Sequence, residues 1–309
     1  MKRINGHNLK NLQKVWKRDT PFIEEIEEGE EIILDIPDSS TDQVKPGTTN
    51  EDLGKMDQSL LDASVGPLNV KGAKPGDLLE VHIHSIETAK WGFSTLSEDF
   101  GLLKGRFKPS IFYWKIEGGY AIPDGDFLKG IRIPISPFLG VIATLPSSGS
   151  FGMIPPQKFG GNMDNRLNGT GSTVLLPVNI EGAGLSFGDP HACQGDGEVC
   201  GTAVETGATV RISVKIVRNR NISSPVTYST EHTGGKVFCT TGIGPELKTA
   251  AIDAVESMIA QLKTMGFKED ESFLLCSVAG NLRISEIVDE PNYVVSMLLP
   301  ESILRERSD

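Results

Sequence analysis

Cysteine is scarce in this 309-residue chain, which has four, at positions 193, 200, 239 and 276. None of them forms a CxxC pair, so the spacing excludes a disulfide-stapled scaffold and a four-thiolate zinc site. Long hydrophobic runs are missing too. No window approaches the roughly eighteen apolar residues of a membrane-spanning helix, and no apolar segment follows the first basic residues. We therefore expect a cytoplasmic protein without a membrane segment.

Positive charge is also in short supply. Thirty Lys and Arg residues face 41 Asp and Glu residues, which gives a formal net charge of −11. A surface of this sign repels nucleic-acid phosphates and anionic lipids, so we expect neither as a partner. Aromatic residues make up 6% of the chain. This low share argues against a sugar-binding module, which needs exposed aromatic platforms.

Glycine and proline, by contrast, are frequent, with 34 and 18 residues placed between short β-branched runs. This pattern of short apolar runs separated by glycine and proline is typical of strands and turns. In residues 209–217, apolar side chains alternate with polar ones, which predicts a strand with one buried face. Prolines at positions 134 and 177 favour sheet edges or bulges. Further strands are predicted at residues 31–36, 77–86, 130–137, 139–145 and 172–178.

The pattern changes near residue 244. Between Leu247 and Met265, apolar residues recur at helical spacing, with Pro245 before them and Gly266 after them, which predicts a helix. A second helix is predicted at 269–279, because three acidic residues suit its N-terminus, and a closing strand at 293–299. We expect a β-rich body over residues 1–220 and a smaller α+β unit over residues 221–309, packed on it.

Two glycine-rich segments hold the candidate chemistry. The first covers residues 188–201 and contains four groups that bind metals or transfer protons: Asp189, His191, Asp196 and Glu198. Its glycines allow tight turns that bring such groups together. The second, residues 159–164, supplies Asn162 and Asp164. If the strand at 172–178 brings both loops to one sheet edge, histidine and carboxylates form a ligand set for a divalent cation.

The same segments carry a resemblance to a known family. Gly160-Gly-Asn-Met-Asp164, Gly188-Asp189 and His191-Ala-Cys-Gln-Gly-Asp-Gly-Glu198 resemble the acetamidase/formamidase family, as do shorter motifs at residues 66–67, 72–77, 176–178 and 201–205. The resemblance implies a mainly β fold, with a jelly-roll-like β-sandwich and a smaller C-terminal α+β portion. It also implies a homo-oligomer, a divalent metal, and hydrolysis of short linear aliphatic amides such as formamide and acetamide to ammonia and carboxylate.

The residue types fit amide hydrolysis by a metal-activated water, which needs no Ser or Cys nucleophile. Zinc is the favoured metal and calcium the alternative. The candidate residues are His191, Asp164 and Asp189 for the metal, Glu198, His191 and Asp196 for catalysis, and Asn162 and Gln194 for hydrogen bonding to the amide.

Other interpretations stay open beside this one. A cytoplasmic β-rich binding module, with structural calcium in the acidic glycine-rich loop, would share the composition but release no ammonia from amides. The Ser-rich loop at 146–152 and Cys193 are weak nucleophile candidates, because their partner residues are not evident. We leave His82 and His84 out of the site, since such a pair on one strand face is more often plain surface. Whether His232 and Asp38 reach it is left open.

Overall fold

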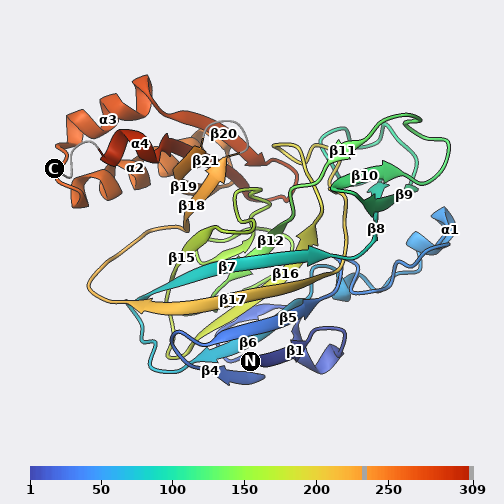
Figure 1. Cartoon of the computed structure of the whole chain (residues 1–309), viewed down its shortest axis with the longest axis horizontal. Helices are drawn as coiled ribbons and strands as arrows, with labels where there is room; N and C mark the ends of the chain where they lie inside the picture. Colours follow the sequence, from blue (N-terminus) through green and yellow to red (C-terminus); the bar gives the residue numbers. More distant parts are fainter. Residues whose placement is uncertain (232–234, 306–309) are drawn as a thin grey trace.

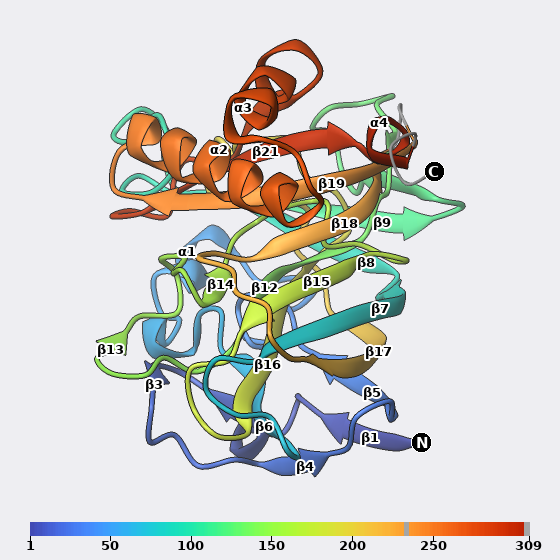
Figure 2. The same ribbon diagram turned by 90° about the vertical axis from the view of Figure 1, so that its left-hand side faces the viewer.

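The computed structural model describes residues 1–231 and 235–305. Strands dominate the chain, two large sheets pack face to face, and the longer helices gather around the C-terminal part (Figures 1 and 2). The expected mainly β, sandwich-like fold is thereby confirmed. No helix within the described ranges is long and apolar enough to cross a membrane.

The larger sheet has nine strands, and its neighbours are antiparallel except for the first two. In spatial order they are β1 (Lys2–Asn5), β5 (Glu31–Ile36), β17 (Ala208–Val217), β7 (Leu78–Thr88), β15 (Thr173–Pro177), β18 (Val226–Glu231), β19 (Gly235–Gly244), β21 (Tyr293–Pro300) and β20 (Asn281–Glu286). The predicted strands at 31–36, 77–86, 172–178, 209–217 and 293–299 are confirmed. Pro177 lies beyond the three residues of β15 that pair with β18, so its missing N–H removes no bond there.

The second sheet packs against the first and has six strands. They are β14 (Gly160–Asn162), β12 (Phe138–Ala143), β16 (Ala183–His191), β6 (Ser64–Val70) and β2 (Leu12–Gln13), with β4 (Glu24–Ile26) also paired to β6. Every residue of β16 is buried. A ribbon of β3 (Trp16–Lys17) and β13 (Ser150–Phe151) pairs beside this sheet, and Trp16 joins Val141 of β12 in a small hydrophobic cluster.

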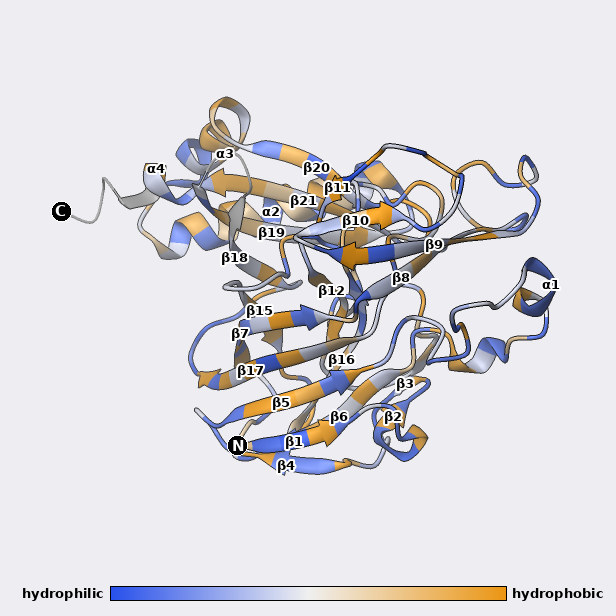
Figure 3. Cartoon of the chain, turned by 45° about the vertical axis from the view of Figure 1, so that its right-hand side comes forward, coloured by the Kyte–Doolittle hydropathy of each residue, from blue (hydrophilic) through white to orange (hydrophobic). Residues whose placement is uncertain are grey.

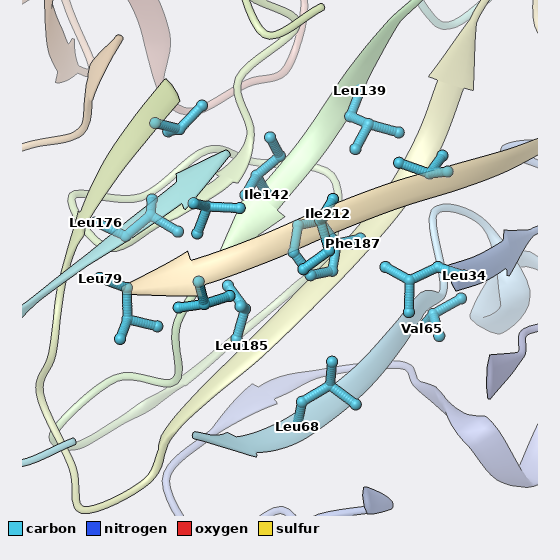
Figure 4. Close-up of a cluster of buried hydrophobic side chains, with 14 of the residues drawn as sticks. Leu34, Val65, Leu68, Leu79, Leu139, Ile142, Leu176, Leu185, Phe187 and Ile212 are labelled. Atoms are coloured by element: carbon cyan, nitrogen blue, oxygen red, sulfur yellow. The ribbon is translucent and has the colours of Figure 1, made fainter. Parts of the chain in front are cut away.

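The main core lies between the two large sheets. Leu79 and Ile212 of the first sheet belong to the same hydrophobic cluster as Leu139 and Phe187 of the second, and all four side chains are fully buried (Figure 4). Burying one such side chain contributes about 1.5–3 kcal/mol. The opposite face of β17 carries Thr209, Arg211, Ser213 and Lys215, so hydropathy alternates along this strand (Figure 3). In β5 burial alternates in the same way, although Ile33 lies on its outer face. The alternation predicted from the sequence therefore defines the core face of the larger sheet.

A separate four-stranded sheet covers one end of the sandwich. Its strands are β8 (Trp91–Leu96), β9 (Ser110–Glu117), β10 (Tyr120–Pro123) and β11 (Ile133–Pro134). The strand predicted at 130–137 is thus reduced to two residues at a sheet edge. Pro134 and Pro137 lack the N–H groups that would continue the ladder, which explains the short pairing.

The C-terminal part confirms the predicted helices. They are α2 (Leu247–Thr264) and α3 (Glu269–Val278), and a short helix α4 (Glu301–Arg305) follows. The N-terminal part contains only a short helix α1 (Asn50–Leu53) and the 3-10 turns Leu9–Asn11 and Gln58–Leu60 among its described residues. Helix α2 begins after Glu246 and ends before Gly266, whose φ of +88° suits a helix stop. It packs on β19 and β21 through Ala250, Ala254 and Met258. These strands continue the nine-stranded sheet, and the division at residue 220 stays a prediction.

Candidate active site

Both glycine-rich segments contain strand ends rather than free loops. Strand β12 pairs with β14 on one side and with β16 on the other, so that Val141 lies opposite both Asn162 and Gly188. The segments are therefore brought together by β12. The strand at 172–178, which we expected to do this, belongs to the other large sheet. Alternation predicts that a strand exists, but it does not identify the neighbours of that strand.

Gly140 of β12 leaves room for two carboxylates. A Cβ atom at this position would lie 2.3 Å from Asp189 Oδ2 and 2.4 Å from Asp164 Oδ1. The backbone holds the arrangement, because the N–H of Met163 donates to the Gly140 carbonyl at 2.9 Å. Asp164 and Asp189 thus converge over a glycine, and no larger residue fits there without displacing them.

Three acidic residues of the cluster have an unusual backbone. Asp164, Asp189 and Glu198 have φ values of 42°, 52° and 44°, in the left-handed region that non-glycine residues rarely adopt. Such conformations cost of the order of 1 kcal/mol or more each and concentrate at functional sites. The fold therefore holds these three side chains in place against a local preference for another conformation.

His191, at the end of β16, is the centre of the cluster. Its Nε2 atom lies 2.9 Å from Asp189 Oδ2 and 3.1 Å from Glu205 Oε2, and all three side chains are buried. The ligand atoms of these residues lie within 4.8 Å of one another, and so do those of a second group, Asp164, His191 and Glu198. Each group thus brings two carboxylates and one imidazole nitrogen close together.

Gln194 fixes the orientation of the imidazole. Its Nε2 donates to the main-chain carbonyl of Asp164 at 2.9 Å, which leaves Oε1 to face His191 Nδ1, also at 2.9 Å. Because Oε1 can only accept, Nδ1 of His191 must carry the proton of this bond. The Nε2 atom is then directed toward Asp189 and Glu205, as metal-binding histidines are directed by their second nitrogen.

A further pair of side chains comes from distant parts of the chain. Asn162 Nδ2 donates to Asp289 Oδ2 at 2.8 Å, and both side chains are buried. The Oδ1 atom of Asn162 has no hydrogen-bond partner among the described residues. Asp289 follows β20, so the C-terminal part of the chain completes the site.

Burial dominates the electrostatics of the cluster. It raises the pKa of Asp164 and of Asp189 to about 8, and repulsion by neighbouring carboxylates adds to this effect. Burial likewise raises the pKa of Glu198 well above its ordinary value. For His191, burial lowers the pKa, but Asp189 and Glu205 outweigh it and raise that pKa well above its usual range. The cluster therefore stabilises positive charge at the imidazole.

A cavity of about 130 Å³ opens beside these residues. Its polar part consists of the side chains of Asn162, Asp189, His191, Glu198, Glu205 and Asp289, together with those of Asp62, Ser39, Ser40, Thr95 and Thr202. Its apolar part consists of the side chains of Met56, Leu61, Phe93, Phe100 and Ile154. It is smaller than the pockets of about 300–1,000 Å³ that hold drug-sized ligands. Its size suits a molecule of a few heavy atoms.

Comparison with known proteins identifies the family. Residues 2–152 and 148–306 match the Acetamidase/Formamidase family. The chain belongs to this family. It is 26% identical to the formamidase of Methylophilus methylotrophus, over 93% of this chain and 88% of that protein.

Solved structures of similar proteins have the same fold. The acetamidase of Bacillus halodurans superimposes with a TM-score of 0.90 at 28% identity, over 99% of this chain and 100% of that one. A predicted acetamidase/formamidase from Thermoanaerobacter tengcongensis gives a TM-score of 0.88 at 30% identity, over 98% and 97% of the two chains. Family membership confirms the expected amide hydrolase. It leaves no support for the alternative of a binding module with structural calcium.

The structure separates the predicted site residues into two sets. It brings Asn162, Asp189, His191 and Glu198 together around one cavity, and Asp164 belongs to the same cluster of ligand groups without lining the cavity. Asp196 is not among them, because its side chain is 36% exposed and pairs with Arg166 at 2.8 Å. Gln194, expected to bind the amide, instead has both polar ends bonded within the protein.

His82 and His84, which we left out of the site, and Asp38, which we left open, do not line the cavity. His82 and His84 are partly buried on the larger sheet, where they bond Thr173 and Ser213. Asp38 is buried and bonded to Ser40, near Glu205 but not lining the cavity. His232 lies outside the described residues.

Three acids that line the cavity were missed as candidates: Asp62, Glu205 and Asp289. Glu205 is part of the motif at 201–205, yet its distance from the acidic segment hid its role. Its backbone bridges to both Phe93 and His191, which a single sequence does not reveal. Asp289 lies about a hundred residues after His191, without local glycine-rich context. Only the tertiary fold places Glu205 beside His191 and Asp289 beside Asn162.

Proposed function

We propose that this member of the acetamidase/formamidase family hydrolyses the carbon–nitrogen bond of short linear aliphatic amides, with formamide and acetamide as substrates and ammonia and carboxylate as products. The observation that carries the proposal is the buried convergence of Asp189, His191 and Glu205 beside a cavity of about 130 Å³. The relatives named formamidase and acetamidase support the same substrate class.

The side chains fit a divalent cation. Both oxygens of Asp164 and Oδ1 of Asp189 are buried without a hydrogen-bond partner among the described residues. Such carboxylates are costly to bury unless positive charge neutralises them. Asp189, His191 and Glu205 would hold the cation, and Asp164 lies on the Nδ1 side of the ring, at 3.9 Å. When bound, the cation supplies Lewis acidity toward the amide carbonyl and toward water.

The nature of these ligands favours zinc. One imidazole nitrogen with two carboxylates is a set that zinc binds readily, whereas calcium prefers oxygen ligands alone. Elemental analysis of the purified protein tests this assignment. One equivalent of zinc supports it, and calcium as the sole bound metal contradicts it.

Glu198 is proposed as the acid/base. It lines the cavity, and burial raises its pKa well above that of an ordinary glutamate, which favours the protonated carboxyl that a proton donor to the leaving nitrogen requires. In hydrolysis it takes a proton from the attacking water and delivers it to the leaving nitrogen. Asn162 is held through Nδ2 by Asp289, and its unpartnered Oδ1 accepts a hydrogen bond from the amide N–H₂ group.

Ammonia release from formamide and acetamide tests the function. The variant Glu198→Gln keeps the shape of the side chain but removes its proton transfer, so we expect kcat to fall about 10²–10⁴-fold. Asp196→Asn makes the equivalent change on an exposed acid of the same loop and should leave kcat within about twofold, which is small on the scale of catalytic losses. Equal losses in both variants, or no ammonia from any short amide with wild-type protein, would contradict the proposal.

We further propose a cytoplasmic homo-oligomer. All four cysteines are unpaired, in keeping with a reducing compartment. The outer face of α2, α3 and β20 exposes Ile252, Phe273 and Leu282 around a groove of about 790 Å³, and apolar patches of this kind mark protein interfaces. Light scattering at micromolar concentration measures the assembly, and a monomeric mass contradicts this part of the proposal. Export of the protein from the cell contradicts the location.

A further inference from the structure

We infer that Phe100 sets the length of the acyl group that the site accepts, an inference that rests on the proposed amide hydrolysis. Phe100 belongs to the apolar part of the cavity and Glu198 to its polar part. In a hydrolysed amide, the nitrogen must reach the polar groups, so the acyl carbons extend toward the apolar wall. The position of that wall determines how many carbons fit.

Phe100 lies in the connection between β8 and β9, which is docked on the segment that carries Glu198. The N–H of Leu102 donates to the carbonyl of Val199 at 2.9 Å. A Cβ atom on Gly101 would lie 2.7 Å from the carbonyl oxygen of Cys200, so the two backbones touch. This connection is therefore a fixed wall of the cavity.

The ring itself is supported from behind. A Cβ atom on Gly201 would lie 2.4 Å from Phe100 Cδ1, so the aromatic ring rests directly on the Gly201 backbone. The N–H of Gly201 donates in turn to the carbonyl of Glu198 at 2.7 Å. The Phe100 ring cannot move toward Gly201, because the backbone already fills that space. The distance between the ring and Glu198 is therefore set by the packing of the two segments against each other.

Phe93, the other phenylalanine of the apolar wall, is less suited to this role. Phe93 belongs to β8, is 3% exposed, and pairs through its backbone with Glu205. A change at Phe93 therefore disturbs a proposed ligand as well as the cavity. Phe100 lies in a loop, and its side chain can be shortened without removing a strand residue. It is therefore a position where cavity length changes without altering a proposed ligand.

The test compares kcat/KM for formamide, acetamide, propionamide and butyramide. Phe100→Ala should raise the butyramide-to-acetamide ratio at least about tenfold, because one methylene is worth about 10–200-fold in a fitted pocket. Leu102→Ala is the matched control, since Leu102 lies in the same loop, is 52% exposed and does not line the cavity. Its ratio should equal that of the wild type. If Phe100→Ala fails to fold, Phe100→Leu provides the same comparison with a smaller shift.

Gly201→Ala acts in the opposite direction. The added methyl pushes the Phe100 ring into the cavity, so acetamide should lose more kcat/KM than formamide. The φ of +84° at Gly201 strains an alanine. That strain alone should lower kcat/KM for both substrates by the same factor and leave the ratio of the two values unchanged. An unchanged ratio in active Phe100 variants overturns this inference alone. Inactivity of the wild type toward all four amides overturns the proposed function and this inference with it.

Discussion

At the scale of the residue, the site depends on a position that has no side chain. Gly140 is the point where Asp164 and Asp189 approach each other, and a Cβ atom there would lie 2.3–2.4 Å from their oxygens. We expect Gly140→Ala to abolish ammonia release and metal binding, because at least one carboxylate must move by an ångström or more. Metal content and activity of the purified variant measure this. Gly195→Ala is the control, since its Cβ meets nothing within 4 Å; equal losses in both variants would contradict the argument.

Single residues also show what a sequence reveals about a site. His191, Asp189 and Glu198 were predictable because they lie within ten residues and have the chemistry that metals and proton transfer require. Proximity in sequence also suggested Asp196, but its side chain is turned outward and pairs with Arg166. It failed for Glu205, which is brought to His191 by a β-bridge. A local cluster in the sequence indicates which residue types a site contains. The path of the backbone decides which of those side chains reach the site.

At the scale of the element, strand existence was predictable and strand pairing was not. The alternation in 209–217 identifies β17 and its core face, because a period of two places every second side chain on one side. The run at 139–145 likewise identifies β12. Nothing in that run indicates that β12 lies between β14 and β16, and this arrangement creates the site. Pairing partners depend on contacts between distant segments, which one sequence does not report.

The contact between α2 and the main sheet has a consequence at this scale. A Cβ atom on Gly242 of β19 would lie 1.9 Å from the Ala250 carbonyl oxygen and 2.4 Å from the Ala254 nitrogen. We expect Gly242→Ala to push the helix off the strand and to lower the free energy of unfolding by about 1–3 kcal/mol, as other overpacked cores do. Gly244→Ala, with its nearest contact at 3.5 Å, serves as the control. Denaturant unfolding curves compare the two, and equal stability contradicts the close approach.

At the scale of the whole molecule, the buried acids oppose folding unless a cation balances them. Burial raises the pKa of Asp164, Asp189 and Glu286 to about 8. Without a cation, the folded protein therefore holds protons that the unfolded chain releases above about pH 4. The contribution of these acids to the free energy of unfolding then falls as pH rises from about 4 to 8, because they bind fewer protons in the unfolded state over this interval.

Metal removal should consequently matter more at higher pH. We expect a chelator to lower Tm by about 5 °C or more at pH 7.5, since a bound cation stabilises only the folded state. At pH 5.5 protons neutralise the same carboxylates and compete with the cation, so the chelator should lower Tm much less. The difference between treated and untreated samples at each pH isolates the site from acids elsewhere in the chain. Recovery of Tm on adding zinc supports the argument, and an equal chelator effect at both pH values contradicts it.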